Sequence, residues 1–268
     1  MQKERLDVLL VSKGLIATRE RAKSTVMAGL VTVDGQRIDK AGTAVSATAD
    51  IKVIGDSIGY VSRGGLKLEK GLKAFKLDLN GKVMADIGAS TGGFTDCALQ
   101  NGASRVYAID VGYGQLAWSL RTDARVINME RTNIRSILPE HIGEPLDFVS
   151  VDVAFISLTK VLPTIRTLLA PDGLVVALIK PQFEAGREKV GKKGVVKDPQ
   201  VHREVIAKIT ATAREIGFTP QGLSFSPVKG PEGNIEYLIF LANYPGEDSL
   251  EDTVIEQVVK EAHAMLAG

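Results

Sequence analysis

The sequence predicts an α/β protein in which a seven-stranded mixed sheet, covered by helices, follows a small α+β unit. Short apolar runs alternate with segments of helical periodicity from about residue 64 to the C-terminus, which is typical of a sheet with crossover helices. The first 59 residues instead contain two short helical patterns and several short strand patterns. A glycine-containing stretch without periodicity, residues 55–62, separates the two parts. We therefore expect two domains, residues 1–59 and 60–268.

The N-terminal unit is predicted from turn and capping residues. The expected elements are a helix from Lys3 to Lys13 that ends at Gly14, a helix capped by Thr18 that closes at Gly29, a hairpin of 31–33 and 36–38 around Asp34-Gly35, and a strand at 50–54. Arginines and a lysine decorate the two helices and could form one basic face: Arg5, Arg19, Arg21 and Lys23. On charge alone, an ordinary solvated surface explains them equally well.

The order of features in this unit favours RNA binding. The segments RLDVLLVSKGL and TRERAKSTVMAGLVTVDG closely resemble the alpha-L RNA-binding module of a small-subunit ribosomal protein, pseudouridine synthases and bacterial tyrosyl-tRNA synthetases. The resemblance implies that the two helices contact the phosphates of structured RNA, which positions a protein without necessarily reading sequence.

A glycine-rich turn follows the first strand of the larger domain. The segment KVMADIGASTGG, residues 82–93, reads as a buried strand at 83–87, a tight turn and the start of a helix at 94–99. Ligands of open α/β sheets bind beyond the carboxyl ends of the strands. The spacing G-x-x-x-G-G departs from the dinucleotide fingerprint G-x-G-x-x-G. It favours S-adenosylmethionine (SAM) over NAD as the cofactor, and a turn without any ligand is the remaining alternative.

The residues expected around SAM come from this turn and from the ends of the next two strands. Asp110, 22 positions after Gly88, suits a carboxylate that binds ribose hydroxyls. Glu130 is expected near the adenine, and Asp86 either contacts the methionine amine through water or orients the turn. The full predicted set is Asp86, Gly88, Ser90, Thr91, Gly92, Gly93, Phe94, Asp110, Val111 and Glu130.

The remaining elements continue the alternation. We expect a helix with an apolar stripe at Leu68, Leu72 and Phe75, strands at 105–109, 125–129, 146–151, 174–179, near 223 and at 235–242, and helices at 157–169, 199–216 and 248–266. Pro163 is expected to kink or restart its helix. Lys67 and Lys70 lie off the apolar stripe, so solvent exposure is the simplest interpretation of both.

Composition excludes several classes of protein. The chain is 44% hydrophobic and 24% charged, as in ordinary globular proteins. It shows no signal-peptide layout or membrane-spanning run, and its three scattered histidines predict no metal site. The single cysteine, Cys97, fits a cytoplasmic protein and is expected as a buried apolar residue. Residues 63–76 hold five Lys/Arg and one Asp/Glu, so a polyanion is expected at a local basic surface.

Four charged residues lie at element edges on the expected ligand side: Lys67, Asp152, Lys180 and Glu236. Each alone is more simply a surface charge. However, five segments of the chain resemble the TlyA family of ribosomal RNA 2′-O-methyltransferases, also named hemolysin A. They are VSRGGLKLEKGL, ADIGASTGGFTDCALQNGASRVYAIDVGYGQL, VSVDVAFISL, LIKPQFE and GNIEYLIF. The resemblance implies a Rossmann-like class I methyltransferase fold similar to FtsJ-type enzymes, rRNA or ribosomal subunits as substrate, with cytidine as the nucleotide, and a Lys-Asp-Lys-Glu tetrad at these four positions.

The chemistry implied by the tetrad is general-base catalysis. A ribose 2′-hydroxyl is a weak nucleophile and needs a positioned base, which we assign to Lys180. Lysine has a pKa near ~10.4, whereas useful bases lie near ~7–8. A nearby lysine and desolvation lower such a pKa and carboxylates raise it, so Asp152 and Glu236 are expected to orient groups rather than to activate the base.

The loop 182–198 is long and basic, and we expect it to be a mobile flap that binds RNA phosphates, although a disordered solvated loop is an alternative. The cations expected to contact RNA in the larger domain are Arg63, Lys189, Lys192 and Lys193. Three other functions remain open: a non-catalytic RNA-binding or assembly factor, a membrane-active hemolysin, and a dehydrogenase. The acidic C-terminal amphipathic helix is unfavourable for binding anionic lipid.

Overall fold

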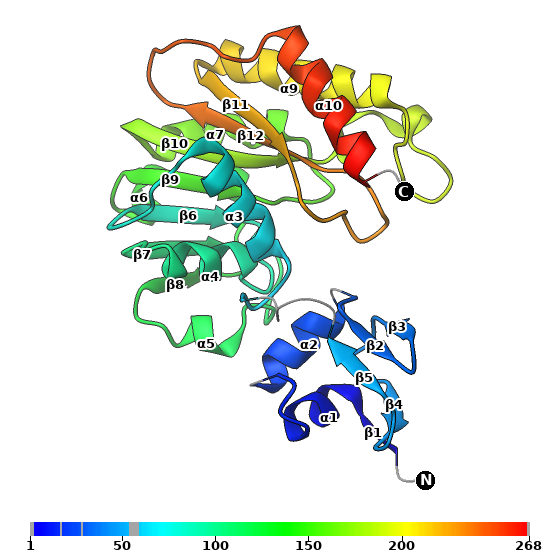
Figure 1. Cartoon of the computed structure of the whole chain (residues 1–268). Helices are drawn as coiled ribbons and strands as arrows, with labels where there is room; N and C mark the ends of the chain where they lie inside the picture. The colour runs from blue at the N-terminus through cyan, green and yellow to red at the C-terminus, as the bar shows by residue number, and fades with distance from the viewer. Residues whose placement is uncertain (1–2, 17, 28, 54–58, 267–268) are drawn as a thin grey trace.

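The computed structural model describes residues 3–16, 18–27, 29–53 and 59–266. It contains a small N-terminal unit and a larger unit built on one sheet (Figure 1). The stretch expected to link the two lies partly outside the described residues, since residues 54–58 are not described.

The N-terminal unit has two helices and two small sheets. Its elements are β1 (Lys3–Arg5), α1 (Leu6–Ser12), α2 (Arg19–Met27), β2 (Val31–Val33), β3 (Gln36–Ile38), β4 (Ala44–Ser46) and β5 (Ile51–Val53). The hairpin predicted around Asp34-Gly35 is confirmed, and both turn residues have the positive φ that this turn type requires, 50° and 80°. The cap predicted at Thr18 is also confirmed, because its Oγ1 accepts the Arg21 N–H at 3.3 Å.

The first helix is shorter than predicted. The prediction of a helix from Lys3 was wrong, because Lys3–Arg5 pairs antiparallel with β4 and the helix begins at Leu6. The apolar side chains of α1 and α2, among them Leu6, Leu10 and Val26, form a core of their own with β2 and β5.

The larger unit contains the predicted seven-stranded mixed sheet, in the order β11-β12-β10-β9-β6-β7-β8. Its elements are α3 (Gly64–Phe75), β6 (Val83–Ile87), α4 (Gly93–Gln100), β7 (Arg105–Ile109), α5 (Trp118–Arg121), β8 (Val126–Met129), η1 (Ile134–Ser136), α6 (Pro139–Ile142), β9 (Leu146–Val151), η2 (Leu158–Lys160), α7 (Leu162–Leu168), β10 (Leu169–Ile179), α8 (Pro181–Glu184), η3 (Arg187–Lys189), α9 (Pro199–Ile216), β11 (Thr219–Phe225), β12 (Tyr237–Ala242) and α10 (Asp252–Leu266). Pro163 lies in the first turn of α7, after the short helix η2, as the restart prediction requires.

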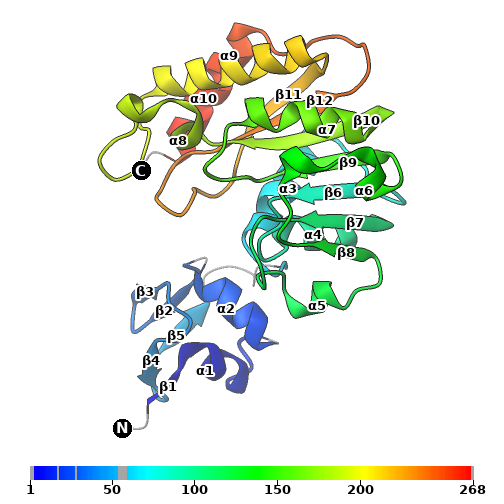
Figure 2. The same cartoon turned by 180° about the vertical axis from the view of Figure 1, so that it is seen from behind.

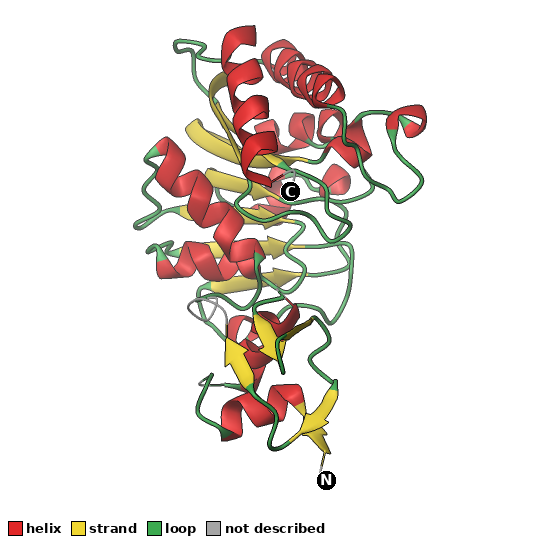
Figure 3. Ribbon diagram, turned by 45° about the vertical axis from the view of Figure 1, so that its right-hand side comes forward, coloured by secondary structure: helices red, strands yellow, loops and turns green. Residues whose placement is uncertain are grey.

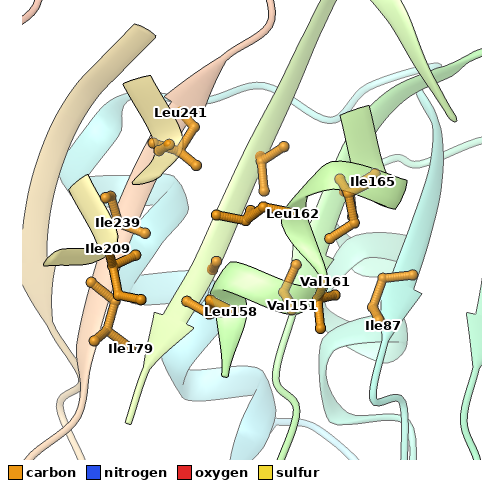
Figure 4. Close-up of a cluster of buried hydrophobic side chains, with 14 of the residues drawn as sticks. Ile87, Val151, Leu158, Val161, Leu162, Ile165, Ile179, Ile209, Ile239 and Leu241 are labelled. Carbon is orange, nitrogen blue, oxygen red and sulfur yellow. The ribbon is translucent and has the colours of Figure 1, made fainter. Parts of the chain in front are cut away.

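Helices cover both faces of the sheet (Figures 2 and 3). Side chains alternate along β6: Met84 packs with α3 and α4, whereas Ala85 and Ile87 point to the opposite face. Figure 4 shows this second face, where Ile87 and Val151 from the strands meet Leu162 and Ile165 of α7. Both cores hold the parallel strands rigidly and fix the positions of their carboxyl ends.

One strand runs against the others. β12 is antiparallel to β10 and β11, while the β8, β7, β6, β9 and β10 neighbours pair in parallel. Because Tyr237 pairs with Ile179, the start of β12 lies beside the carboxyl end of β10. Residues just before β12 therefore reach the edge of the sheet at which the parallel strands end.

Candidate functional site

The four charged residues of the predicted tetrad meet at this edge. Lys67 comes from α3, Asp152 follows β9, Lys180 follows β10 and Glu236 precedes β12. Lys67 Nζ lies 2.6 Å from Glu236 Oε2 and 3.6 Å from Asp152 Oδ2, and Lys180 Nζ lies 2.5 Å from Asp152 Oδ1. Two ammonium groups and two carboxylates thus form one connected, electrically balanced cluster.

The cluster has a buried side and an accessible side. We call Lys67–Glu236 the inner pair, since these side chains are 7% and 1% exposed, and Asp152–Lys180 the outer pair, at 19% and 11%. The expectation of a solvated Lys67 was therefore wrong. Lys70, one turn away, is half-buried with its ammonium 5.8 Å from the centre of the Phe225 ring.

Ion pairing outweighs the effect of burial on the pKa of both Lys67 and Asp152. Burial alone would lower the pKa of Lys67, but the charges of Asp152 and Glu236 outweigh burial and raise it. Burial would likewise raise the pKa of Asp152, but Lys67 and Lys180 outweigh that effect and lower it. Lys67 is therefore held as a cation, and Lys180 is the more exposed of the two lysines.

The glycines of the turn after β6 are required by packing. Gly88 has φ +85°, and an added Cβ would collide with the backbone carbonyl of Asp152. A Cβ on Gly92 would meet Leu120, and one on Gly93 would meet Ser62 and the start of α3. The turn is thus pressed against the elements that carry the cluster. Ser90, between these glycines, adopts φ +48° with an exposed side chain.

Asp86 lies under the turn. Its fully buried carboxylate accepts the backbone N–H of Thr95 at 2.9 Å and the Thr95 hydroxyl at 2.7 Å, in the first turn of α4. Burial raises the pKa of Asp86 to about 7. Of its two expected roles, this position matches orientation of the turn.

Asp110, at the end of β7, contacts the same turn. Its Oδ2 accepts the Ser90 N–H at 2.8 Å and its Oδ1 accepts the Gly112 N–H at 2.6 Å. Asp110 is half-buried, and Val111 beside it is exposed. Exposed Ser90 and Thr91 together with Asp110 offer hydroxyl and carboxylate groups that fit the polar methionine and ribose parts of SAM.

The side chains of Glu130 and Phe94 already make contacts within the protein. Glu130 accepts hydrogen bonds from Arg121, Asn128 and the backbone of Gln115 and Leu116, and although burial opposes this, these bonds lower its pKa to about 2. Glu130 thus shapes the loop after β7. Phe94 packs in the hydrophobic core below the turn, as does Cys97, whose predicted burial is confirmed.

Two aromatic rings lie next to the outer pair. Phe155, three residues after Asp152, is exposed and has φ +62°. Its ring centre lies 4.9 Å from that of Phe183, three residues after Lys180. Glu184 ties the two loops together, because it accepts the Ser157 hydroxyl at 2.6 Å and the Leu158 N–H at 2.8 Å. No sequence pattern predicts these contacts.

The predicted cations lie in three places. Arg5 and Arg19 both contact Asp7, a residue that sequence reasoning missed, while Arg21 is half-buried and Lys23 exposed. Arg63 immediately precedes α3, one turn before Lys67. In the loop 182–198, Lys192 and Lys193 are exposed.

The loop 182–198 is anchored to the body of the larger unit. Lys189 pairs with Glu204 of α9 at 2.6 Å. The Val196 N–H donates to Asn234 Oδ1 at 3.0 Å, and the Val196 carbonyl lies 3.0 Å from His202 Nε2. These contacts tie the loop to α9 and to the segment that carries Glu236; its mobility stays a prediction.

A search of the described part of the chain for membrane-spanning helices finds none of sufficient length and apolarity.

Comparisons with known proteins match both units. The model of FtsJ-like methyltransferases matches residues 60–243, and that of the S4 domain matches residues 4–51. The curated "Putative rRNA methyltransferase YqxC" of Bacillus subtilis is 53% identical over 270 residues, which is 99% of this chain and 96% of that protein.

Two further proteins are similar along most of the chain. The "16S/23S rRNA (cytidine-2′-O)-methyltransferase TlyA" of Mycobacterium tuberculosis is 46% identical over 241 residues, 90% of each chain. A solved structure named "Putative hemolysin", from Streptococcus thermophilus, superposes with a TM-score of 0.80 at 48% identity, over 100% of this chain and 98% of that one.

Proposed function

Since this chain belongs to the TlyA family of FtsJ-like, SAM-dependent methyltransferases, with an N-terminal S4 domain, we propose that it methylates a ribose 2′-hydroxyl of ribosomal RNA. Cytidine is the proposed target nucleotide, as the name of the M. tuberculosis relative suggests. We place the boundary between the two domains near residue 60 and expect the protein to act in the cytoplasm, where ribosomal subunits are found.

The observation that carries this proposal is the balanced cluster beside the glycine turn. Lys67, Asp152, Lys180 and Glu236 meet at the carboxyl edge of the sheet, and Gly88 packs directly on the backbone of Asp152. A methyl donor bound by Ser90 and Asp110 would therefore lie next to the outer pair. A cofactor site alone would not require four charges at this place.

The residues divide the work of the reaction. Bound SAM supplies an electrophilic methyl group on its sulfonium sulfur. Lys180, accessible and held by Asp152 at 2.5 Å, accepts the proton of the 2′-hydroxyl as the oxygen attacks. It must first release its own proton to solvent, a step that the Asp152 carboxylate opposes and the nearby positive charge of Lys67 favours. Glu236 anchors Lys67 and so keeps that charge in place.

Exposed cations and an exposed aromatic ring would suit an RNA substrate. The S4 domain presents Arg5, Arg19 and Lys23 as solvent-accessible cations. The exposed ring of Phe155, in contact with Phe183 beside the outer pair, offers a flat apolar face for a base. Arg63, Lys192 and Lys193 are further proposed phosphate contacts.

Transfer of tritiated methyl groups from SAM to purified 30S and 50S subunits tests the function. We expect labelled 2′-O-methylcytidine, identified by mass mapping of the nucleosides. Labelling of a base instead of a ribose, or binding of rRNA without any transfer, would contradict the proposal; the latter would indicate a non-catalytic RNA-binding or assembly factor.

Membrane activity is the alternative suggested by the name of the S. thermophilus structure. Leakage of dye from liposomes at submicromolar protein would support it. Stabilisation of the protein against heat by NAD rather than SAM would instead favour a dehydrogenase.

A further inference from the structure

A buried carboxylate lies at the centre of the basic face of the S4 domain. Asp7, in the first turn of α1, has a fully buried side chain. Its Oδ1 accepts Arg5 Nε at 3.0 Å, and its Oδ2 accepts both Arg5 Nη2 at 3.1 Å and Arg19 Nε at 3.1 Å. One carboxylate therefore joins the start of α1 to the start of α2 through two guanidinium groups.

The hydrogen bonds to Asp7 leave the outer sides of both guanidinium groups free for a ligand. Arg5 uses two of its five N–H groups on Asp7 and Arg19 uses one. Within the described residues, their other N–H groups have no hydrogen-bond partner. The side chains of Arg5 and Arg19 are 51% and 54% exposed, so a ligand can reach both guanidinium groups, with Gly42 beside Nη1 of Arg5. The three residues together carry one net positive charge, which matches a single phosphodiester.

We infer that Asp7 is a positioning residue that holds Arg5 and Arg19 as one preformed site for an RNA phosphodiester group. The inference rests on the proposed function, because it takes RNA as the ligand. Free arginine side chains lose rotamer freedom when they bind, whereas these two are already fixed through their Nε atoms. Asp7 thus strengthens binding of a polyanion although it is itself an anion.

This inference and simple electrostatics predict opposite signs for one substitution. Asp7→Asn removes a negative charge from a basic face, so charge alone predicts tighter RNA binding. If Asp7 positions the arginines, Asp7→Asn weakens binding, because the amide nitrogen of Asn faces guanidinium donors and releases them. The expected loss is about twofold to tenfold for each arginine released.

The experiment compares Asp7→Asn with Glu20→Gln as a matched control. Glu20 is an exposed acidic residue in the first turn of α2, next to Arg19, so its substitution removes the same charge without touching either guanidinium contact. Filter binding to 16S and 23S rRNA transcripts, without SAM and at several salt concentrations, measures the affinities. We expect Asp7→Asn to bind more weakly than wild type and Glu20→Gln as tightly or more tightly. Binding by Asp7→Asn as tight as that of Glu20→Gln overturns the inference.

Arg19→Lys decides the question if Asp7→Asn unfolds the domain, as thermal unfolding would reveal. Lysine keeps the charge at this half-exposed position. It lacks the planar guanidinium group that can bind Asp7 and a phosphate at the same time in one fixed geometry. We expect at least twofold weaker rRNA binding with an unchanged melting temperature; unchanged affinity overturns the inference.

The wild-type protein separates this inference from the proposed function. Wild-type protein that binds rRNA but transfers no methyl group refutes the enzymatic proposal alone, and the variants still decide the role of Asp7. Wild-type protein without affinity for rRNA refutes both.

Discussion

Asp152 in the catalytic domain and Asp7 in the S4 domain share one arrangement, a carboxylate between two cations. Asp152 lies between Lys67 and Lys180, and Asp7 lies between Arg5 and Arg19. The two clusters differ in the cations and in their exposure. The lysines are at most 11% exposed, whereas both arginines are more than half exposed.

The difference shows how the choice of cation separates chemistry from binding. Lysine can lose its proton when its surroundings change, while arginine stays charged under all ordinary conditions. Under the two proposals above, a carboxylate that orients largely buried lysines prepares a base, and one that orients arginines at the surface prepares an anion site.

The largest effect is expected at Lys180. Lys180→Ala removes the proposed base and should lower the rate of methyl transfer by about 10²–10⁴-fold, the usual contribution of a general base. SAM binding, measured by calorimetry, should stay nearly intact. A loss of SAM affinity would move Lys180 to a cofactor-binding role.

Lys180→Arg is the matched control for charge. The arginine can keep the ion pair with Asp152 but cannot accept a proton at neutral pH. We expect it to be as inactive as Lys180→Ala, and substantial activity would show that a positive charge, not a base, is needed there.

The inner pair should dominate stability. Lys67→Met leaves Glu236 buried without its partner and should lower the free energy of unfolding by about 3–5 kcal/mol in denaturant titrations. The double variant Lys67→Met/Glu236→Gln should regain most of that stability but not methyl transfer. A double variant no more stable than the single one would mean that the pair stabilises the fold outright.

Asp86 should make stability depend on pH. Its pKa of about 7 lies above the unfolded value of about 3.9, so between these pH values the folded protein keeps a proton that the unfolded chain releases. The free energy of unfolding should therefore fall as pH rises through this window, by up to about 1.4 kcal/mol per pH unit. Asp86→Asn should flatten the slope in denaturant titrations at pH 4.5 and 6.5. The exposed Asp172→Asn is the control, and an equal slope in Asp86→Asn and wild type would refute the assignment.

Lys189 should have the smallest effect. It pairs with Glu204 at the surface, where both side chains are more than 40% exposed, so Lys189→Ala should cost less than about 1 kcal/mol of stability. If Lys189 contacts a phosphate, the substitution should also reduce the salt slope of rRNA binding by about one. Glu204→Gln, which frees the lysine, should not weaken binding.

Much of the fold follows from local patterns. Strands β6, β7 and β9 are mostly apolar, as expected where both faces of a parallel sheet are buried, and their predicted bounds are confirmed. β1 and β4 escaped prediction because each is only three residues long, too short to show strand periodicity, and Lys3–Arg5 is also entirely charged. β10 starts earlier than expected, at Leu169, and its pairing with β9 is irregular between Leu169 and Leu174.

The site was only partly predictable. The positions of Asp152 and Lys180 at strand ends place them together in any sheet of this topology. The burial of Lys67 could not be predicted from local patterns, because its buried partner is Glu236, 169 residues later. The glycines were expected to admit a ligand, but their nearest neighbours are Leu120, Ser62 and the Asp152 carbonyl, contacts that no local pattern contains.

The position of β12 near the end of the chain also determines when the cluster can be completed during biosynthesis. Lys67 leaves the ribosome 169 residues before the carboxylate that neutralises it. At 5–20 residues per second this interval is roughly ten to thirty seconds. During it, the nascent chain has an S4 domain and most of the parallel strands, and once Asp152 has been made Lys67 lacks only Glu236 as a partner. The last strand to enter the sheet thus also completes the four-residue cluster.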